Sequence, residues 1–305
     1  MTAAASSSGG WLADDLALAL RDDLALALRA ADVADGVSLP GYERRGFSVE
    51  RKADHSEVTV IDRATETAIS DMLRAQRPDY SLYGEEHGVV GPREARRQWV
   101  VDPIDGTSNF VRGVPVWATL IALVDDGVPV LGVVSAPALQ RRWWAARGLG
   151  AHGVTAHGAA RELRVSTTNE LRRASASITV SESWHAAGKT VQLDRLQRGV
   201  ARLRNYGDFW QHMLVAEGAV DFEASCTPGY RAAKIRATSS RTWLASSTLI
   251  RLLTSFWFSL PCIGCEPPQA RPALTFVDRL SGFPRGEGKE FIRLSHHGGK
   301  AGAGR

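Results

Sequence analysis

The chain has 305 residues, of which 44% are hydrophobic and 23% charged, a balance typical of one large or two small globular domains and not of a disordered or collagen-like chain. Its 37 Lys and Arg exceed its 33 Asp and Glu by only four. Residues 226–305 hold 12 Lys and Arg against 4 Asp and Glu, whereas residues 1–225 hold 25 against 29. Because no basic or aromatic periodicity accompanies this local excess, no nucleic-acid partner is expected.

The cysteines and the N-terminal residues bear on the cellular compartment. All three cysteines, Cys226, Cys262 and Cys265, lie in the last quarter of the chain, so the rest lacks the disulfide pattern of a secreted domain. The first residues contain no basic segment followed by an apolar one, as a secretory signal would. The most membrane-like stretch, 244–265, contains an arginine and a proline and is not expected to span a bilayer. The sequence therefore predicts a cytoplasmic protein with no membrane partner.

Residues 1–10 are small and polar, and a disordered leader is expected there, before a domain over 11–225. The octapeptide DDLALALR occurs twice in succession, at 14–21 and 22–29, with Leu and Ala at helical spacing and acids at its start. This pattern predicts an amphipathic helix. Eight residues turn roughly 80° past two full turns of an α-helix, so the two copies face different directions. We interpret the repeat as a tandem duplication, not as a functional repeat.

Two glycine-bracketed segments lead to a second helix, expected to begin at Asp62 and to end before Pro78. SLYGEEHG at 81–88 predicts a strand end and a loop, and WVVDPIDGTSNFVRG at 99–113 predicts a buried strand, a turn and the start of a helix. Asp125-Asp126-Gly127 between two apolar runs predicts a β-hairpin.

Further along, RRASASITVS predicts a strand, and helices are expected over 191–203 and from Phe209 to about Gly218. The alternation of strands and helices indicates an α/β or α+β fold. After about Phe222 the hydrophobic periodicity fades, and no segment is typical of a helix or a strand.

The densest chemical signal is the run Asp102-Pro103-Ile104-Asp105-Gly106-Thr107. Two carboxylates three residues apart across a proline-fixed turn can converge on one point, and with a carbonyl such as that of Ile104 they offer the hard oxygen ligands that suit Mg²⁺. The glycine and threonine that follow offer N–H groups and a hydroxyl at a helix start, where an anion is favoured. Glu85 and Glu86 add two acids from a loop. The pattern predicts phosphate chemistry, with an ordinary Asp-Gly turn and a solvated acidic loop as the alternatives.

The string GEE at 84–86, followed by DPIDGTSNF at 102–110, resembles the inositol monophosphatase superfamily of Mg²⁺-dependent, lithium-sensitive phosphomonoesterases. VTVIDRATE, YGDF and LVAEGAVD look most like the actinobacterial histidinol-phosphatase group, and the likeness covers roughly residues 32–221. It implies a layered αβαβα sugar-phosphatase fold, with the metal and phosphate site in 54–110 and a substrate half from about 135. The implied activity is hydrolysis of L-histidinol phosphate in histidine biosynthesis, and an inositol-1-phosphate or related sugar phosphatase is the alternative.

The resemblance also implies two or three Mg²⁺ ions and their ligands. Glu85, Asp102 and the carbonyl of Ile104 are implied to hold one ion. Asp102 and Asp105 are implied to share a second, and Asp62 to help hold a more weakly bound one. The catalytic residues in this scheme are Glu85, Asp102 and Thr107, the first and last of which would orient the attacking water.

The resemblance also implies which residues bind the phosphate and the rest of the substrate. The residues implied to bind phosphate or substrate are Asp105, Gly106, Thr107, Arg204 and Asp208. Arg204 matches a substrate-contacting arginine, and Asp208 is a candidate for the amine or hydroxyl end of a small phosphorylated substrate. The superfamily often dimerises, so a homodimer is one expected assembly.

The family pattern stops after Asp221. Members carry a further aspartate that completes the second metal site, followed by a Glu-Ala-Gly-Gly turn, and neither motif is present in this sequence. Here Trp243 is followed by Leu244. We interpret 226–305 as an aberrant tail, translated out of frame or created by a gene-model error, against the alternative of a genuine divergent C-terminus. A catalytically degenerate product is therefore the competing hypothesis from another functional class.

Overall fold

The computed structural model describes residues 8–53, 56–155 and 158–225, with side chains from residue 18 onward. The helices are α1 (Ser8–Arg44), α2 (Val60–Gln76), α3 (Thr107–Arg112), α4 (Ser183–Ala186), α5 (Thr190–Gly199) and α6 (Asp208–Ala216), with 3₁₀ turns at Pro137–Leu139 and Leu171–Arg173. The strands are β1 (Val49–Arg51), β2 (Glu57–Thr59), β3 (Ser81–Gly84), β4 (Gly88–Val90), β5 (Arg97–Asp105), β6 (Ala118–Asp125), β7 (Val128–Ala136), β8 (Arg141–Ala146), β9 (Gly150–Thr155), β10 (Arg161–Glu162), β11 (Ser175–Ile178), β12 (Arg202–Arg204) and β13 (Phe222–Ala224).

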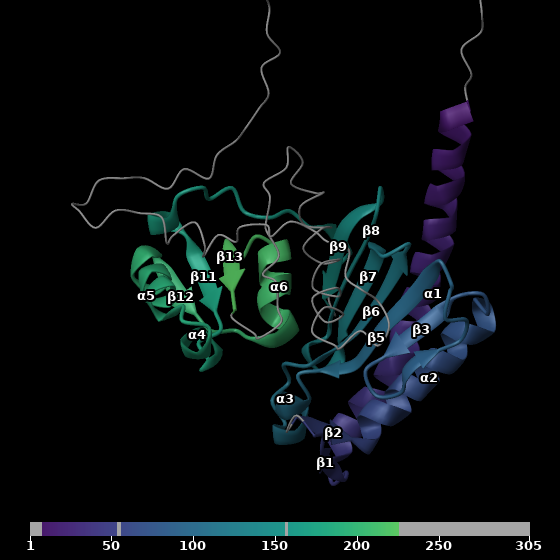
Figure 1. Cartoon of the computed structure of the whole chain (residues 1–305), viewed down its shortest axis with the longest axis horizontal. Helices are drawn as coiled ribbons and strands as arrows, with labels where there is room; N and C mark the ends of the chain where they lie inside the picture. The colour runs from purple at the N-terminus through teal and green to yellow at the C-terminus, as the bar shows by residue number, and fades with distance from the viewer. Residues whose placement is uncertain (1–7, 54–55, 156–157, 226–305) are drawn as a thin grey trace, which may run out of the picture.

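Helices and sheets alternate in layers (Figure 1). α1 and α2 cover one face of an eight-stranded sheet of order β10-β9-β8-β7-β6-β5-β3-β4, and α6 packs on its other face through Phe209 and Met213. α6 also contacts the parallel sheet β12-β11-β13, where Gln211 accepts a hydrogen bond from the Ser177 hydroxyl at 2.9 Å. α4 and α5 complete that second unit through Trp184 and Leu196. The expected αβαβα fold is thereby confirmed.

Helix α1 is longer than the sequence pattern predicts. It begins at Ser8, inside the expected leader 1–10, whose first seven residues lie outside the described part of the chain. It also continues through Gly36 and Pro40, so the first of the glycine-bracketed segments is part of this helix. Two contacts favour the helix: the Ser38 hydroxyl donates to the Ala34 carbonyl at 2.7 Å, and a Cβ at Gly41 would lie 2.9 Å from the Ile61 side chain. Burial against the neighbouring helix therefore outweighs the weak helix propensity of this segment.

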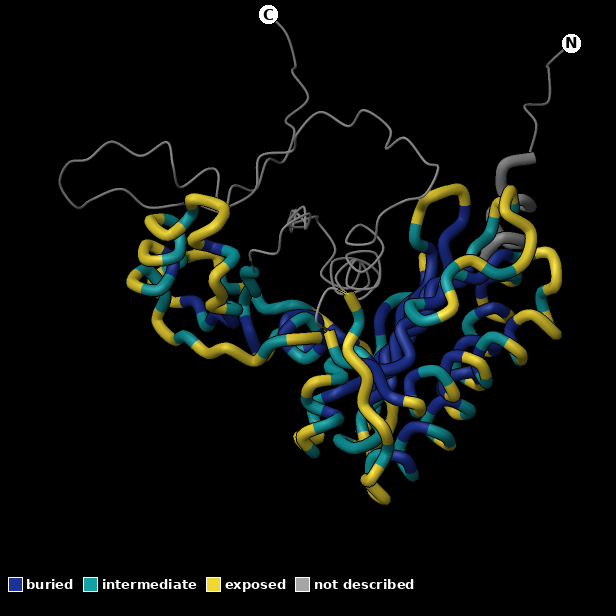
Figure 2. The backbone as a smooth tube through the Cα atoms, turned by 60° about the horizontal axis from the view of Figure 1, so that its bottom comes forward, coloured by how far each residue is buried: buried dark blue, intermediate teal, exposed yellow. Residues whose placement is uncertain are grey.

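The second copy of the repeated octapeptide lies in the core. Leu26 and Ala27 are buried against α2 and the large sheet together with Leu20 of the first copy, whereas Leu18 of the first copy is 59% exposed. The N-terminal turns of α1 stand clear of the sheet in Figure 1, and Figure 2 shows buried backbone concentrated in the strands and the helix faces turned toward them. In the part of the chain that is described, no helix is both long and apolar enough to cross a bilayer. The stretch 244–265 and the whole tail 226–305 lie outside that part.

Helix α2 begins at Val60, two residues before the expected start, because Thr59 is its N-cap. The Thr59 hydroxyl accepts from the amide of Asp62, whose carboxylate accepts in return from the Thr59 amide at 2.9 Å. This capping box replaces hydrogen bonds that the first helical amides lack. The helix ends before Pro78, as predicted.

The hairpin between β6 and β7 is confirmed, since Asp126 and Gly127 both have positive φ, the conformation of a two-residue type I′ turn. The helix expected over 191–203 is wrong at its C-terminal end. α5 ends at Gly199, and Leu203 lies in β12, which pairs with β11 in parallel. That pairing is made with residues almost thirty positions upstream, and a local pattern does not contain it.

Candidate active site

Two acids lie at the end of β5, where its pairing with β6 changes register. Asp102 is opposite Leu120 and Asp105 is opposite Ala118, so two residues of β5 face one residue of β6. The Thr119 hydroxyl donates to the Pro103 carbonyl at 2.8 Å and holds this bulge. The expected turn is therefore an irregularity within the strand, which bends the strand locally. It leaves the carboxylates of Asp102 and Asp105 close enough to repel each other.

Gly106 and Thr107 connect β5 to α3. Gly106 has φ +87°, and a Cβ there would lie 3.0 Å from the Val116 carbonyl oxygen, so glycine suits this position in both conformation and space. The Thr107 hydroxyl lies 2.9 Å from the Ile104 carbonyl oxygen and 3.1 Å from Oδ1 of Asp62. It has one proton for these two acceptors. The hydroxyl thus links the end of β5 to the first turn of α2.

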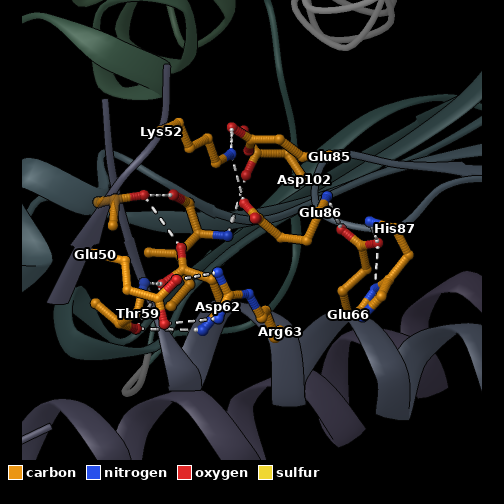
Figure 3. Close-up of polar contacts among 12 residues, drawn as sticks. Glu50, Lys52, Thr59, Asp62, Arg63, Glu66, Glu85, Glu86, His87 and Asp102 are labelled. Carbon is orange, nitrogen blue, oxygen red and sulfur yellow. Dashed lines mark hydrogen bonds and ion pairs between the residues drawn. The ribbon is translucent and has the colours of Figure 1, made fainter. Parts of the chain in front are cut away.

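The loop that carries Glu85 and Glu86 is held by Glu66, a fully buried residue of α2 (Figure 3). The Glu66 carboxylate accepts from the amides of Glu86 and His87, both at 2.8 Å, and lies 2.8 Å from Nδ1 of His87. Gly84 makes room for it, because a Cβ there would lie 2.0 Å from Oε1 of Glu66. Sequence reasoning missed Glu66, although its position one helical turn after Asp62 on the same face was a usable signal.

Lys52, which follows β1, is a second residue that sequence reasoning missed. Its Nζ lies 2.9 Å from Oε1 of Glu85 and 2.7 Å from Oε1 of Glu86, and Figure 3 shows the ammonium between the two acids. Burial alone would lower the pKa of Lys52, but the bonds to Glu86 and Glu85 outweigh this effect and raise it. No motif in the sequence marked this lysine.

The start of α6 reaches the same region from the other sheet. The amide of Phe209 donates to Oδ2 of Asp105 at 2.8 Å, and the Asn109 side-chain amide donates to Oδ2 of Asp208 at 2.9 Å. Asp208 is exposed and has φ +44°, an uncommon conformation for a residue with a side chain. Arg204 is exposed on β12, and its Nη1 donates to the carbonyl of Leu203. Within the part of the chain that is described, no hydrogen bond or ion pair joins Arg204 to the acids.

Three acids of the site have raised pKa values, because burial and neighbouring carboxylates disfavour their negative charge. Burial raises the pKa of Asp102 well above its ordinary value, and the nearby Glu85 and Asp105 raise it further. Burial, followed by the charge of Asp208, raises the pKa of Asp105 to about 7. Burial also raises the pKa of Asp62 to about 6, despite the hydrogen bonds from Thr59 that favour its ionised form. A cation placed here would relieve this repulsion.

The chemistry of the donors fits Mg²⁺, because every acid of the cluster offers oxygen and Mg²⁺ prefers carboxylate oxygen to nitrogen or sulfur. Across the described residues, no group of three or more Asp, Glu, His or Cys side chains is arranged so that it could hold a metal ion. Lys52 contacts Glu85, one of the expected ligands, at 2.9 Å. The donor set therefore suits Mg²⁺, with an ammonium group in contact with one of its members.

Comparison with known proteins gives relatives that include histidinol-phosphatases of two bacteria. The chain is 49% identical over 211 residues to a histidinol-phosphatase of Mycobacterium tuberculosis, covering 69% of this chain and 78% of the relative. It is 46% identical over 195 residues to a histidinol-phosphatase of Streptomyces coelicolor, covering 63% and 73% of the two chains. Among solved structures, an inositol monophosphatase from Zymomonas mobilis is similar with a TM-score of 0.58 and 31% identity, covering 77% of this chain and 84% of that one.

A match to a protein-family model agrees with these relatives. The model of the inositol monophosphatase family matches residues 20–230, which include every acid described above and all three sheets of the described residues. The fold of the SuhB protein from Bartonella henselae agrees, with a TM-score of 0.60 and 25% identity over 75% of this chain and 85% of that one. The chain belongs to the inositol monophosphatase family.

Proposed function

We propose that this chain is a Mg²⁺-dependent phosphoric monoester hydrolase that converts L-histidinol phosphate to L-histidinol and phosphate in histidine biosynthesis. The observation that carries the reaction class is the meeting of Glu85, Asp102 and Asp105 beside the Thr107 hydroxyl. The substrate is supported by the likeness to the two bacterial histidinol-phosphatases, which extends over about two thirds of this chain.

In this proposal, Glu85, Asp102 and the Ile104 carbonyl hold one ion, Asp102 and Asp105 share a second, and Asp62 helps to hold a third. Bound Mg²⁺ supplies the positive charge that activates water and stabilises the leaving oxygen. The Thr107 hydroxyl and Glu85 orient the attacking water. The hydroxyl suits this role because it keeps a hydrogen bond to the Ile104 carbonyl or to Asp62 while its lone pairs stay available.

Asp105, Gly106 and Thr107 bind the phosphate, and Asp208 with Arg204 binds the rest of the substrate. Asp208 is exposed next to Asp105, with its Oδ2 held by the Asn109 amide. A carboxylate at this place suits the ammonium group of L-histidinol phosphate, whereas myo-inositol 1-phosphate offers only hydroxyl groups. This difference favours the amine substrate over a sugar phosphate.

Release of phosphate by the purified full chain tests the proposal. With Mg²⁺ present, kcat/KM for L-histidinol phosphate is expected to exceed that for myo-inositol 1-phosphate by about 100-fold, and EDTA should abolish both reactions. Asp208→Asn should lower kcat/KM for L-histidinol phosphate but leave p-nitrophenyl phosphate hydrolysis unchanged. A preference for the inositol phosphate would support the sugar-phosphatase alternative. Mg²⁺ binding without turnover of any of the three would support the degenerate product.

The domain limits and the setting of the enzyme are part of the same proposal. We place the phosphatase domain at 11–225 in the cytoplasm and treat 226–305 as an aberrant tail, in line with the end of the family match at 230. Sequencing of the transcript across codons 220–305 tests the tail, because another reading frame should restore the missing aspartate and the Glu-Ala-Gly-Gly turn. Replacing 226–305 with the corresponding part of the M. tuberculosis relative should then raise turnover.

Light scattering tests the proposed homodimer, and titration calorimetry measures the number of Mg²⁺ ions bound.

A further inference from the structure

Lys52 lies where the acid cluster meets solvent. Its Nζ is 2.9 Å from Glu85 and 2.7 Å from Glu86, and Glu85 lies near enough to Asp102 to raise the pKa of that carboxyl. Figure 3 shows the ammonium between Glu85 and Glu86, with Asp102 drawn beside Glu85. Asp102 is 3% exposed and the Glu86 side chain 5%, so water screens their mutual repulsion poorly. The Lys52 ammonium supplies a positive charge that offsets part of the repulsion around Glu85 and Glu86.

The side chain of Lys52 is also free to leave. It has a flexible four-carbon stem and is only half-buried, and the preceding strand β1 is exposed along its whole length. The acids have other restraints: the Glu86 amide is bound by Glu66, and Asp102 belongs to the central strand β5. Departure of the ammonium would therefore leave the backbone of the acids in place.

We propose that Lys52 is a stand-in cation that is exchanged for Mg²⁺. In the metal-free protein its ammonium holds Glu85 and Glu86 against Asp102, and it leaves Glu85 when the first ion binds. The inference rests on the proposed function in one respect, namely that Glu85 and Asp102 are Mg²⁺ ligands. Lysine keeps its proton throughout, so the exchange replaces a single charge with a double one and needs no other reactant. Lys52 thus acts as a positioning residue before metal binding and as a competitor during it.

Calorimetric titration of the EDTA-treated full chain with MgCl₂ tests the exchange. If Mg²⁺ must displace the ammonium, Lys52→Met should bind the first ion about tenfold more tightly, which corresponds to about 1.4 kcal/mol at 25 °C. The same variant should melt at a lower temperature than the unmodified chain in EDTA and at a similar temperature in Mg²⁺. Lys52→Arg, which keeps the charge, should stay close to the unmodified chain. Arg198→Met removes one charge from an exposed pair on α5 and should change neither quantity.

The outcomes separate the two proposals. Equal or weaker Mg²⁺ binding by Lys52→Met would overturn the exchange and leave the phosphatase proposal standing. Absence of Mg²⁺ binding in the unmodified chain would refute the metal site, and the exchange with it.

A second measurement needs no variant. Brief acetylation followed by mass spectrometry should find Lys52 protected in EDTA and several-fold more reactive in Mg²⁺, because ammonium groups in ion pairs acylate slowly. Lys189, at the start of α5, is the internal reference. Unchanged or reduced reactivity of Lys52 in Mg²⁺ would contradict the exchange even if Lys52→Met failed to fold.

Discussion

Asp105→Asn should stabilise the metal-free protein, although Asp105 is proposed as a metal ligand. The substitution removes one charge from a repelling cluster and keeps the shape of the side chain. Its remaining carbonyl oxygen can still accept the hydrogen bond that the Phe209 amide now donates to Asp105 at 2.8 Å. The variant therefore loses little structure and relieves the repulsion between Asp105 and Asp208.

The size of the effect follows from the pKa of Asp105, which is about 7 in the folded protein against an ordinary value of 3.8. A raised carboxyl pKa means that the unfolded chain loses its proton near pH 4 while the folded chain keeps it, so stability falls as pH rises from 4 to 7 and is constant above that range. The full shift corresponds to about 4 kcal/mol, and screening of this half-buried group reduces it to about 2 kcal/mol. For a protein of this size that is about 4–8 °C in Tm.

Thermal unfolding followed by circular dichroism measures the difference in Tm between Asp105→Asn and the unmodified chain. In EDTA at pH 8 the variant should melt about 4–8 °C above the unmodified chain, and the gain should vanish near pH 4. In 10 mM Mg²⁺ the order should reverse, because the unmodified chain keeps a ligand that the variant has lost. A variant that is less stable in EDTA, or that responds to Mg²⁺ as strongly as the unmodified chain, would refute the argument.

Three further substitutions have distinct expected outcomes. Gly84→Ala places a Cβ 2.0 Å from Oε1 of Glu66, so it should cost about 1–3 kcal/mol in urea unfolding and weaken Mg²⁺ binding in calorimetry. Asp23→Asn breaks a buried ion pair with Arg97 at 3.0 Å and should cost about 3–5 kcal/mol in the same unfolding assay without changing Mg²⁺ affinity. Asp208→Gly relieves a positive φ and should gain about 0.5–1 kcal/mol while raising KM for an amine substrate. An unchanged Mg²⁺ affinity in Gly84→Ala or a changed one in Asp23→Asn would contradict these assignments. A loss of stability in Asp208→Gly would contradict the third.

The closeness of Asp102, Asp105 and Thr107 was predictable because their relation is local, whereas the candidate roles of Glu85 and Asp62 came from the family resemblance. Asp102, Asp105 and Thr107 lie within six residues of one strand-to-helix connection, so their spacing alone limits how far apart they can be. Glu66 and Lys52 reach the same cluster from α2 and from the end of β1, and only the packing of those elements brings them there. A local motif contains no information of that kind.

The errors in the predicted elements have the same origin. Helix α1 passes through Gly36 and Pro40, which on propensity alone would end it, because Gly41 packs closely against Ile61 of α2. Leu203 lies in a strand and not in the predicted helix because β12 has a partner in β11. In both cases a contact distant in sequence decided between two local conformations that were close in free energy.

The position of α6 indicates which function a change after residue 225 would impair first. The acids Glu85, Asp102 and Asp105 are carried by the eight-stranded sheet and its loops, whereas Asp208 is set by α6, which packs on both sheets. β13, the last described strand, pairs with β11 in the smaller sheet. A disturbance next to β13 therefore reaches Asp208, at the proposed substrate end, through β11 and α6 before it reaches the proposed Mg²⁺ ligands on β5. Loss of turnover and of the second Mg²⁺ ion, with the first ion still bound, would be the signature of a defective tail, and loss of all Mg²⁺ binding would point to failure of the large sheet itself.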